Sequence, residues 1–229
     1  MKGIWKLIFR FVKLFVILFI GISLLWVLLY KFVNPPVTWL MVTRGFERKA
    51  DGKDWKIDKE WKDFDEISDG MKRAAVAAED QKFLNHHGFD FEAMGKAINK
   101  NANSKKLVGG STISQQTAKN VFLWPGRSYI RKAFEAYFTA LIEIFWSKKR
   151  IMEVYLNVIE MGDGVYGIQA ASQYYYHKDA SQLTRREAAA IASIFPLPLK
   201  WSPTKPTRYL RHRQSLIVRN IRRLGPLNF

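Results

Sequence analysis

Polar side chains of several kinds are concentrated in the segment GGSTISQQTAKN, residues 109–120. Its glycine pair precedes a predicted helix that Ser111 or Thr112 would cap. One capping oxygen is enough for a helix start, so the remaining polar side chains suit a ligand. Free backbone N–H groups at the helix start, beside a lysine, favour an anion such as phosphate. A solvated loop and helix without a ligand is the alternative. The residues concerned are Ser111, Thr112, Ser114, Gln115, Gln116, Lys119 and Asn120.

Glu79 opens the segment EDQKFLNHHG (79–88) and follows an alanine-rich stretch of predicted helix. Small residues upstream and Phe83 nearby would shield its carboxyl group from water. Shielding raises the pKa of a carboxyl group, and a raised pKa suits a group that transfers protons. The alternative is a surface glutamate next to Asp80.

Glu153 lies four residues after Lys149 and four before Asn157, so the three share one face of the predicted helix KKRIMEVYLN (148–157). Surrounded by basic residues, its carboxylate should stay ionised. The alternative is an ordinary ion pair with Lys149, worth a few tenths of a kcal/mol. Two carboxylates in different environments are typical of enzymes that act on glycosyl bonds.

Two further segments suit a ligand. RKAFE (131–135) places Arg131 and Lys132 at the start of a predicted helix, with Glu135 one turn on. Cations there oppose the helix dipole, which favours an anionic ligand beside them. The loop MGDGVYGIQAA (161–171) has three glycines that would allow the backbone to approach a ligand closely, although a tight turn alone would explain them.

Helical patterns position most of these residues, and strand signals are few. Residues 37–66 mix aromatic and charged side chains without a clean period. A lysine-rich loop is expected just before the glycine pair at 109 and 110. The predicted helices span 71–84 with a stop at His87-Gly88, 91–101, 131–146, 148–158, a segment capped by Thr184 that ends near Phe195, and a basic helix at about 207–224.

An apolar run near the N-terminus predicts a membrane anchor. Leu14 to Tyr30 contain no charged residue, and counting from Phe11 the run reaches the length of roughly 20 residues that a spanning helix needs. The basic residues before it place the N-terminus in the cytoplasm and residues 34–229 outside. A cleaved signal peptide is the alternative, but the end of the run offers no small-x-small cleavage site. The basic residues are Lys2, Lys6, Arg10 and Lys13.

Composition narrows the chemistry further. The 229 residues include no cysteine, which excludes a disulfide, a thiol nucleophile and a cysteine metal site. The four histidines match no zinc spacing, so a bound metal should be a hard cation held by oxygen. Of the net charge of +17, residues 1–33 carry +5 and residues 200–229 carry +8. For a domain outside the membrane, anionic and phosphorylated lipids suit this charge better than nucleic acid does.

Five segments in this order and spacing resemble the family-51 glycosyltransferases, the peptidoglycan glycosyltransferases of bifunctional penicillin-binding proteins and of stand-alone enzymes. The chain resembles the stand-alone form, since the sequence up to Phe229 leaves no room for a transpeptidase domain. The resemblance covers roughly residues 60–205, and Ser114 departs from the usual threonine but keeps the hydroxyl. The segments are EDQKFLNHHG, GGSTISQQTAKN, RKAFE, KKRIMEVYLN and MGDGVYGIQAA.

The resemblance implies a mainly α, lysozyme-like glycosyltransferase domain with a large lobe and a smaller lobe that dips toward the membrane. One N-terminal transmembrane helix precedes this domain. The expected divisions are a cytoplasmic N-terminus (1–10), a transmembrane helix (11–33), a membrane-proximal linker (34–66), the glycosyltransferase domain (67–206) and a basic C-terminal helix (207–229).

The resemblance also implies roles for residues. Glu79 would be the general base that takes the proton from the 4-hydroxyl of lipid II, which attacks the anomeric carbon of the lipid-linked glycan with inversion. Glu153 would be a second catalytic carboxylate, acting at the leaving diphosphate directly or through Mg²⁺ or Mn²⁺, and no organic cofactor is expected. Lys119, Arg131, Lys132 and Lys149 would hold diphosphates. Ser111, Thr112, Gln115, Gln116 and Asn120 would line the donor cleft, Glu135 and Asn157 would contact substrate, and Asp80, Phe83, His86 and Gly88 would support Glu79.

The expected partners are lipid II, the growing lipid-linked glycan, membrane lipids and other cell-wall synthases, at the inner membrane of a bacterium and without nucleic acid. Two other functions fit part of the pattern. A lysozyme-like hydrolase or lytic transglycosylase would use a helix-borne glutamate but would need neither the cations nor an anchor. A membrane-anchored scaffold that binds cell-wall polymer through its basic tail would need no pair of glutamates.

Overall fold

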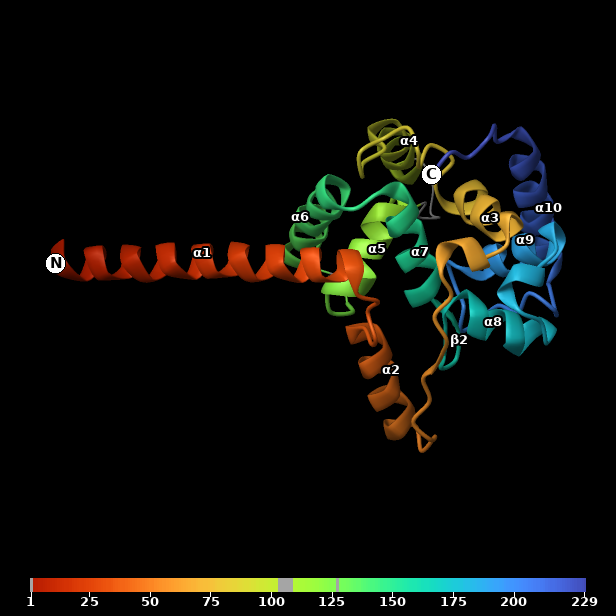
Figure 1. Cartoon of the computed structure of the whole chain (residues 1–229), viewed down its shortest axis with the longest axis horizontal. Coiled ribbons are helices and arrows are strands. Elements are labelled where there is room, and N and C mark those ends of the chain that lie inside the picture. The colour runs from red at the N-terminus through yellow and green to blue at the C-terminus, as the bar shows by residue number, and fades with distance from the viewer. Residues whose placement is uncertain (1, 103–108, 127) are drawn as a thin grey trace. The chain divides into compact units, whose positions relative to one another are not determined.

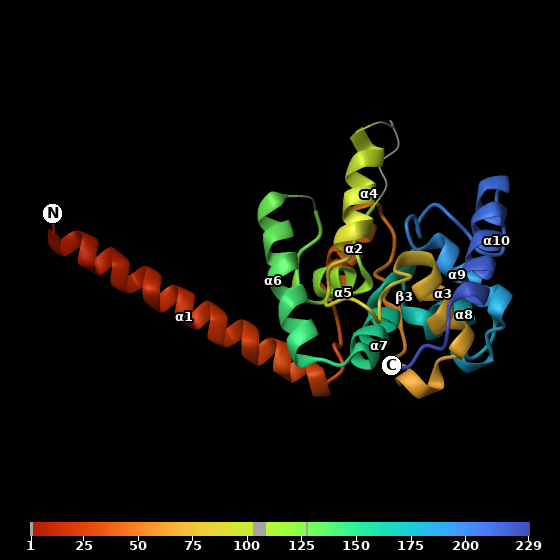
Figure 2. The same ribbon diagram turned by 90° about the horizontal axis from the view of Figure 1, so that it is seen from above.

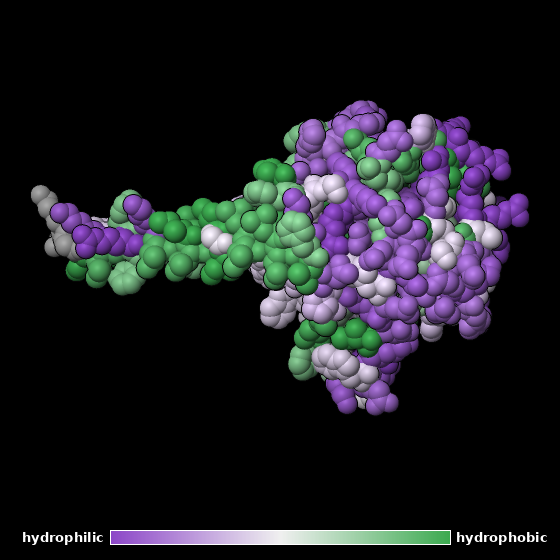
Figure 3. Space-filling model, in the orientation of Figure 1, coloured by the Kyte–Doolittle hydropathy of each residue, from purple (hydrophilic) through white to green (hydrophobic). Residues whose placement is uncertain are grey.

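A single long helix forms the first part of the structure. The computed structural model describes residues 2–102, 109–126 and 128–229. It divides into two compact units, Met1–Asn34 and Pro35–Phe229. In the first, α1 (Lys2–Phe32) is longer than the predicted span of 11–33 at its N-terminal end. Residues Ile4–Phe32 are long and apolar enough to cross a membrane, and Figure 3 shows apolar side chains along this helix. The helix is therefore compatible with a single-pass anchor.

The second unit is mainly helical, which confirms the predicted fold class, and Figure 1 shows its helices. Four of the predicted helices recur within two residues at each end, and a fifth, α9, begins as predicted and ends one residue before Phe195. Serine or threonine side chains cap several helices, as the sequence indicates. The predicted lysine-rich loop lies outside the described residues. The helices are α2 (Trp39–Ala50), α3 (Asp69–Glu79), α4 (Phe91–Ala102), α5 (Ile113–Phe122), α6 (Tyr129–Phe145), α7 (Lys148–Val158), α8 (Gly167–Tyr176), α9 (Arg185–Ile194) and α10 (Arg208–Arg223), with short 3-10 helices η1 (Phe64–Glu66) and η2 (Ala180–Gln182).

The predicted helix over 71–84 is wrong at its end, because α3 stops at Glu79. Asp80 leaves the helical conformation (φ −158°, ψ 80°). Its carboxylate accepts hydrogen bonds from the Ile113 amide and from His86, so the chain must turn here. Gly88 has φ +87°, and a Cβ there would lie 2.7 Å from the Thr139 side chain. The turn therefore occupies the residues that the helical pattern assigned to the last turn of the helix.

A small sheet joins the segment before α3 to the middle of the chain. β1 (Asp58–Lys59) pairs in parallel with β3 (Val165–Tyr166), and β2 (Glu160–Gly162) pairs with β3 in the antiparallel direction. Asp58 lies opposite Val165. The predicted linker and the basic C-terminal segment thus both belong to the unit Pro35–Phe229.

Two groups of helices position the functional residues. α3, α9 and α10 pack on one another, and α5 packs on α6 and α7. Figures 1 and 2 show α3, α9 and α10 side by side from two directions. α7 is largely buried, with Ile151, Val154 and Tyr155 fully inaccessible. The end of α3, the start of α5 and one face of α10 therefore meet around Glu79.

Candidate active site

Glu79 is the last residue of α3, and its side chain is only 15% exposed. Gln116 Nε2 on α5 donates to its Oε2 at 2.9 Å. Arg213 Nη2 on α10 contacts its Oε1 at 3.3 Å. The helical pattern of α3 thus places the Glu79 carboxylate where α3, α5 and α10 meet. Among the described residues, one oxygen contacts α5 and the other contacts α10.

Burial raises the pKa of the Glu79 carboxyl group above its ordinary value, and Asp80 adds to this rise. The hydrogen bond from Gln116 and the charges of Arg213 and Lys119 act in the opposite direction. Because burial dominates, Glu79 holds a proton more readily than an exposed glutamate. This is the property that a general base operating near neutral pH requires.

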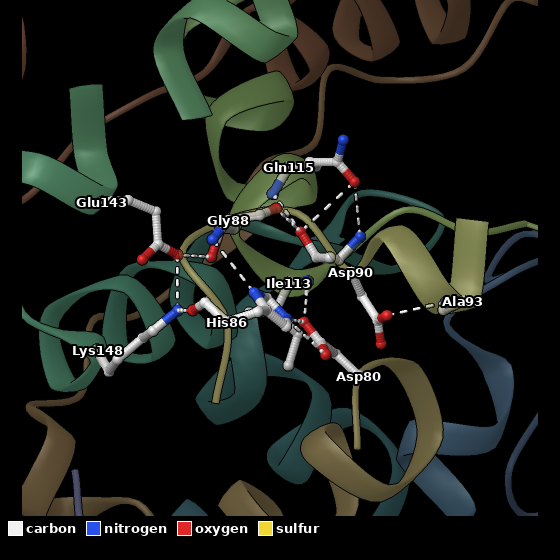
Figure 4. A network of polar contacts seen from close by, with 11 residues as sticks. Asp80, His86, Gly88, Asp90, Ala93, Ile113, Gln115, Glu143 and Lys148 are labelled. Carbon is white, nitrogen blue, oxygen red and sulfur yellow. Dashed lines mark hydrogen bonds and ion pairs between the residues drawn. The ribbon is translucent and has the colours of Figure 1, made fainter. Parts of the chain in front are cut away.

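Asp80 supports the start of α5. Its buried carboxylate accepts from the Ile113 amide at 3.0 Å and contacts His86 Nε2 at 2.9 Å. The Thr112 hydroxyl donates to the Gly88 carbonyl at 2.7 Å. In Figure 4 Asp80, His86 and Ile113 point toward one another. The turn after α3 and the start of α5 are thereby fixed together.

A second set of contacts extends this network to α6 and α7. Glu143 accepts from the Ser114 hydroxyl and from Lys148 Nζ. Lys148 Nζ also donates to the His86 carbonyl at 2.7 Å, as Figure 4 shows. Sequence analysis did not identify Glu143 as functional, because a lone glutamate on an aromatic helix carries no motif. Its contacts make it a structural support for the polar segment of α5.

A cavity of about 480 Å³ lies next to Gln116 and is lined by cations. Lys119 and Arg131 face it, together with Asn120. Burial lowers the pKa of Lys119, and the charges of Glu135 and Glu79 oppose this shift. The Lys119 ammonium group has no hydrogen bond or ion pair among the described residues. The Nε of Arg131 is buried and also has no partner there. Both groups are therefore available to an anion.

Glu135 organises the cations beside this cavity. It is buried, and it accepts from Arg131 Nη1 at 3.0 Å and from Lys132 Nζ at 2.5 Å. It also acts on Lys119 through its charge. Arg131 and Lys132 lie in the first turn of α6 and both pair with Glu135, which fixes their direction. That an anion binds beside them stays a prediction.

A second hollow, of about 350 Å³, includes Glu79 in its lining, whereas the first cavity does not. Glu79, Asp80, Ser111 and Thr112 line it. Ser111 and Thr112 thus do not share the cavity that contains Gln116, Lys119 and Asn120. Gln115 points back onto the Thr112 amide as part of the capping box and lines neither hollow. Only some polar residues of 109–120 therefore line a hollow, and these divide between the two, whereas Ser114 and Gln115 line neither.

Lys149, Glu153 and Asn157 share one helical face, as predicted, but this face contacts the chain between Trp61 and Asp65. Lys149 pairs with Asp65 at 2.8 Å. Asn157 exchanges hydrogen bonds with the backbone of Lys62 at 2.8 and 2.9 Å. These residues therefore attach the segment before α3 to α7.

Glu153 does not pair with Lys149. Arg150 Nη1 donates to its carboxylate at 2.8 Å, and the Arg150 guanidinium lies over the Trp61 ring. Burial raises the pKa of Glu153, and Arg150 opposes this. Within residues 2–102, 109–126 and 128–229, the hydrogen bonds and ion pairs of Glu153 reach neither Glu79 nor the cation-lined cavity.

The groups around Glu153 do not fit a divalent cation. Mg²⁺ prefers several oxygen ligands, whereas a guanidinium occupies this carboxylate and only Asp63 adds a second acidic group nearby. In the described part of the chain, no three His, Cys, Asp or Glu side chains gather as a metal-binding group.

Sequence analysis missed Arg213 and Tyr155. Tyr155 is fully buried behind the site, its hydroxyl lies 3.4 Å from Gln116 Oε1, and burial raises its pKa. Arg213 belongs to a helix that matched no motif. One signal was present in the sequence, because Arg213 lies three residues after Leu210 and four before Ile217, on the apolar stripe of a basic helix.

Comparison with known proteins agrees with the resemblance. The family described as Transglycosylase matches residues 50–222. A biosynthetic peptidoglycan transglycosylase of Caulobacter vibrioides is 54% identical over 191 residues, which are 83% of this chain and 81% of the relative. Proteins of the same name from Pseudomonas putida strain F1 and Xanthomonas campestris pv. campestris strain B100 are 47% and 46% identical, over 90% and 91% of this chain and 88% and 85% of theirs.

Proposed function

Because the chain belongs to the transglycosylase family, we propose that it polymerises lipid II into β-1,4 glycan strands and releases undecaprenyl diphosphate. The enzyme is a glycosyltransferase that acts on peptidoglycan. One observation carries the finer proposal. A shielded carboxylate, Glu79, lines one hollow, and its hydrogen-bond partner Gln116 lines the cation-lined cavity. A transferase that joins two substrates needs two such places near its base.

Glu79 is the general base in this proposal. The acceptor sugar, placed in the hollow that Glu79 lines, presents its 4-hydroxyl to the carboxylate. As the hydroxyl oxygen forms a bond to the anomeric carbon of the donor, its proton passes to Glu79. The bond from that carbon to the diphosphate oxygen breaks, and the electron pair leaves with the diphosphate. Attack opposite the leaving group inverts the anomeric centre, and Glu79 then returns the proton to water.

Lys119 and Arg131 bind the donor diphosphate in the cation-lined cavity. Support comes from two donors without partners in the described residues, Lys119 Nζ and Arg131 Nε. Cations fixed in advance stabilise the negative charge that develops on the leaving group. Glu135 and Lys132 complete this cluster, in which Glu135 orients the cations.

The predicted catalytic role of Glu153 and its divalent cation receive no support from the contacts of Glu153. A dependence on Mg²⁺ or Mn²⁺ stays a prediction, and chelation tests it. We expect Glu153→Gln to show the same dependence on added Mg²⁺ as the unchanged protein, because its carboxylate faces Arg150. A lost metal dependence in this variant would restore the catalytic role of Glu153.

Location follows from α1. We propose that this helix holds the enzyme in the bacterial inner membrane, with the four basic residues before position 14 in the cytoplasm and residues 35–229 outside. A substrate carried on a membrane lipid is reached most directly by an anchored enzyme. Other cell-wall synthases are the protein partners that this location favours.

Incubation of the purified protein with labelled lipid II in detergent tests the proposed function. A polymer that lysozyme digests, absent with Glu79→Gln, is the expected result. The variant must keep the thermal unfolding profile of the unchanged protein for the comparison to count. Normal polymerisation by Glu79→Gln would overturn the assignment of the base. Cleavage of preformed strands without polymer would indicate a lytic enzyme.

A further inference from the structure

The basic C-terminal helix delivers one arginine to the candidate base. Leu210, Ile217 and Ile221 are buried and form the face of α10 that packs on α3 and α9. Arg213 lies on this face, while most other arginines of the helix are exposed. Its side chain is 24% exposed, so its charge is partly removed from water. A charge placed on an apolar helix face needs an acceptor there.

Two acceptors hold the Arg213 guanidinium. Its Nε donates to the Ser193 carbonyl at 3.1 Å, and its Nη2 contacts Glu79 Oε1 at 3.3 Å. Ser193 lies in the last turn of α9, where carbonyl groups have no partner within the helix. The contact with Ser193 fixes the guanidinium independently of Glu79, so the position of Arg213 does not depend on the ionisation of the carboxylate.

Different elements hold the two oxygens of Glu79. α10 provides Arg213 to Oε1, and α5 provides Gln116 to Oε2. The Gln116 amide oxygen in turn faces the hydroxyl of Tyr155 on α7. Each carboxylate oxygen can accept more than one hydrogen bond. The two contacts therefore fix the plane of the carboxylate and leave lone pairs for a hydroxyl that approaches from the hollow.

The charged and titratable groups around Glu79 come from four elements. Asp80 follows it directly, Lys119 lies on α5, Tyr155 on α7 and Arg213 on α10. α9 contributes a carbonyl and no charge. Arg213 is the cation in direct contact with the carboxylate, whereas Lys119 lines the cavity that would hold the diphosphate. Lys119 would thus be engaged by the donor, which leaves Arg213 as the partner of the base.

We propose that Arg213 is a positioning residue, which keeps Glu79 ionised and oriented toward the acceptor hydroxyl. This inference rests on the proposed function, in which Glu79 is the base. It makes the C-terminal helix a part of the active site. The single contact, in place of a bidentate one, leaves the carboxylate basic enough to take a proton.

The pH dependence of kcat/KM for lipid II polymerisation tests this inference. In Arg213→Gln the acidic limb of the profile should move to higher pH by about one unit, because the carboxylate loses its adjacent cation. Above that limb the rate should recover to within a few-fold of the unchanged enzyme. Arg219→Gln is the matched control, since it removes the same charge from an exposed position of the same helix and should leave the limb in place.

Arg213→Lys is the second variant. Lysine keeps the charge but cannot contact Ser193 and Glu79 with a planar fork. Its acidic limb should stay within a few tenths of a pH unit of the unchanged enzyme, with kcat reduced several-fold. A limb displaced as far as that expected for Arg213→Gln would overturn the inference, and this comparison does not require Arg213→Gln to fold. A loss of rate by the same factor at every pH in Arg213→Gln would overturn it as well, as would an unmoved limb.

A titration of the Glu79 carboxyl carbon by ¹³C NMR separates the two proposals. The resonance is identified by its absence in Glu79→Gln. If Glu79→Gln still polymerises lipid II, the proposed function fails, whatever Arg213 does to the titration. If Glu79→Gln is inactive and the titration does not move to higher pH in Arg213→Gln, only the role of Arg213 fails.

Discussion

Glu79 shows how one carboxylate can be both shielded and ionisable. Its burial favours the protonated form, whereas Gln116 and Arg213 favour the charged form. The sequence locates this residue through its alanine-rich helix and its motif. The two partners lie 37 and 134 positions away, so no local pattern predicts the balance between them.

The raised pKa of Glu79 predicts a trade-off between activity and stability. A carboxyl group with a higher pKa in the folded state contributes stability below its unfolded pKa, and this contribution is lost as the pH rises through the folded pKa. At pH 7 the ionised group therefore weakens the fold. Glu79→Gln should unfold at an equal or higher temperature than the unchanged protein at pH 7, with less advantage near pH 4. If Glu79→Gln melted at a lower temperature than the unchanged protein at pH 7 but not near pH 4, this prediction would be contradicted.

Asp80, next in the chain, should have the opposite effect when removed. Its carboxylate is buried, accepts a hydrogen bond from the Ile113 amide and contacts His86 Nε2. Asp80→Ala leaves a buried amide without a partner, which should cost about 2–3 kcal/mol of the free energy of unfolding. Urea unfolding measures this. Asp65→Ala is the control, because Asp65 is exposed and its removal should change the midpoint little.

At the scale of elements, α5 and α9 provide a matched pair. Both begin with a threonine in a capping box with a residue three positions on, Gln115 in α5 and Glu187 in α9. Thr112 also donates to the Gly88 carbonyl, whereas the box at Thr184 is exposed.

Thr112→Ala and Thr184→Ala should each lower stability, by about 1–2 kcal/mol. Only the first should impair polymerisation at temperatures where both variants are folded, since α5 carries Gln116 and Lys119. Thermal unfolding and initial rates measure the two effects. Equal rates would show that the start of α5 does not position the site.

Helical periodicity predicts faces well but does not predict what they meet. The shared face of Lys149, Glu153 and Asn157 is real, yet it holds the segment from Trp61 to Asp65. The chain around that segment has no clean period, and the strand just before it, β1 (Asp58–Lys59), is two residues long. Its pairing with β3 bridges about 107 positions, from Asp58 to Val165. Local sequence carries no signal for a contact of this kind.

The same limit explains α3 and α10. Alanine-rich propensity favours continuation past residue 79, but tertiary hydrogen bonds of Asp80 end the helix. The charge of α10 suggests a separate basic tail, although its apolar stripe packs on α3 and α9. The motifs were sufficient for the family and lead to Glu79 as a candidate, and the partners of Glu79 that they missed lie on distant elements.

At the scale of the whole molecule, the two units predict separable tasks. Residues 35–229 have their own core, and α1 belongs to the other unit. A protein lacking residues 1–34 should keep the melting temperature of this unit within about 2 °C and polymerise lipid II in detergent, because no residue of the site is removed.

Vesicles should reveal what the truncated protein has lost. It should float less with lipid vesicles and act more slowly on lipid II embedded in them, as flotation and initial rates measure. The full chain in the same vesicles is the control. Failure of residues 35–229 to fold would contradict the independence of this unit. Equal flotation and equal initial rates of the two proteins in vesicles would show that α1 does not anchor the enzyme.

The contact between Arg213 and Glu79 has a consequence for how the enzyme folds while it is being synthesised. A ribosome makes the base 134 residues before its partner. α3 can form early, but part of its packing face stays uncovered, and its carboxylate lacks Arg213, until α10 has left the ribosome and folded back. Until then the nascent chain holds the base without its arginine partner, so the pair forms only after α10 has been made and has packed onto α3.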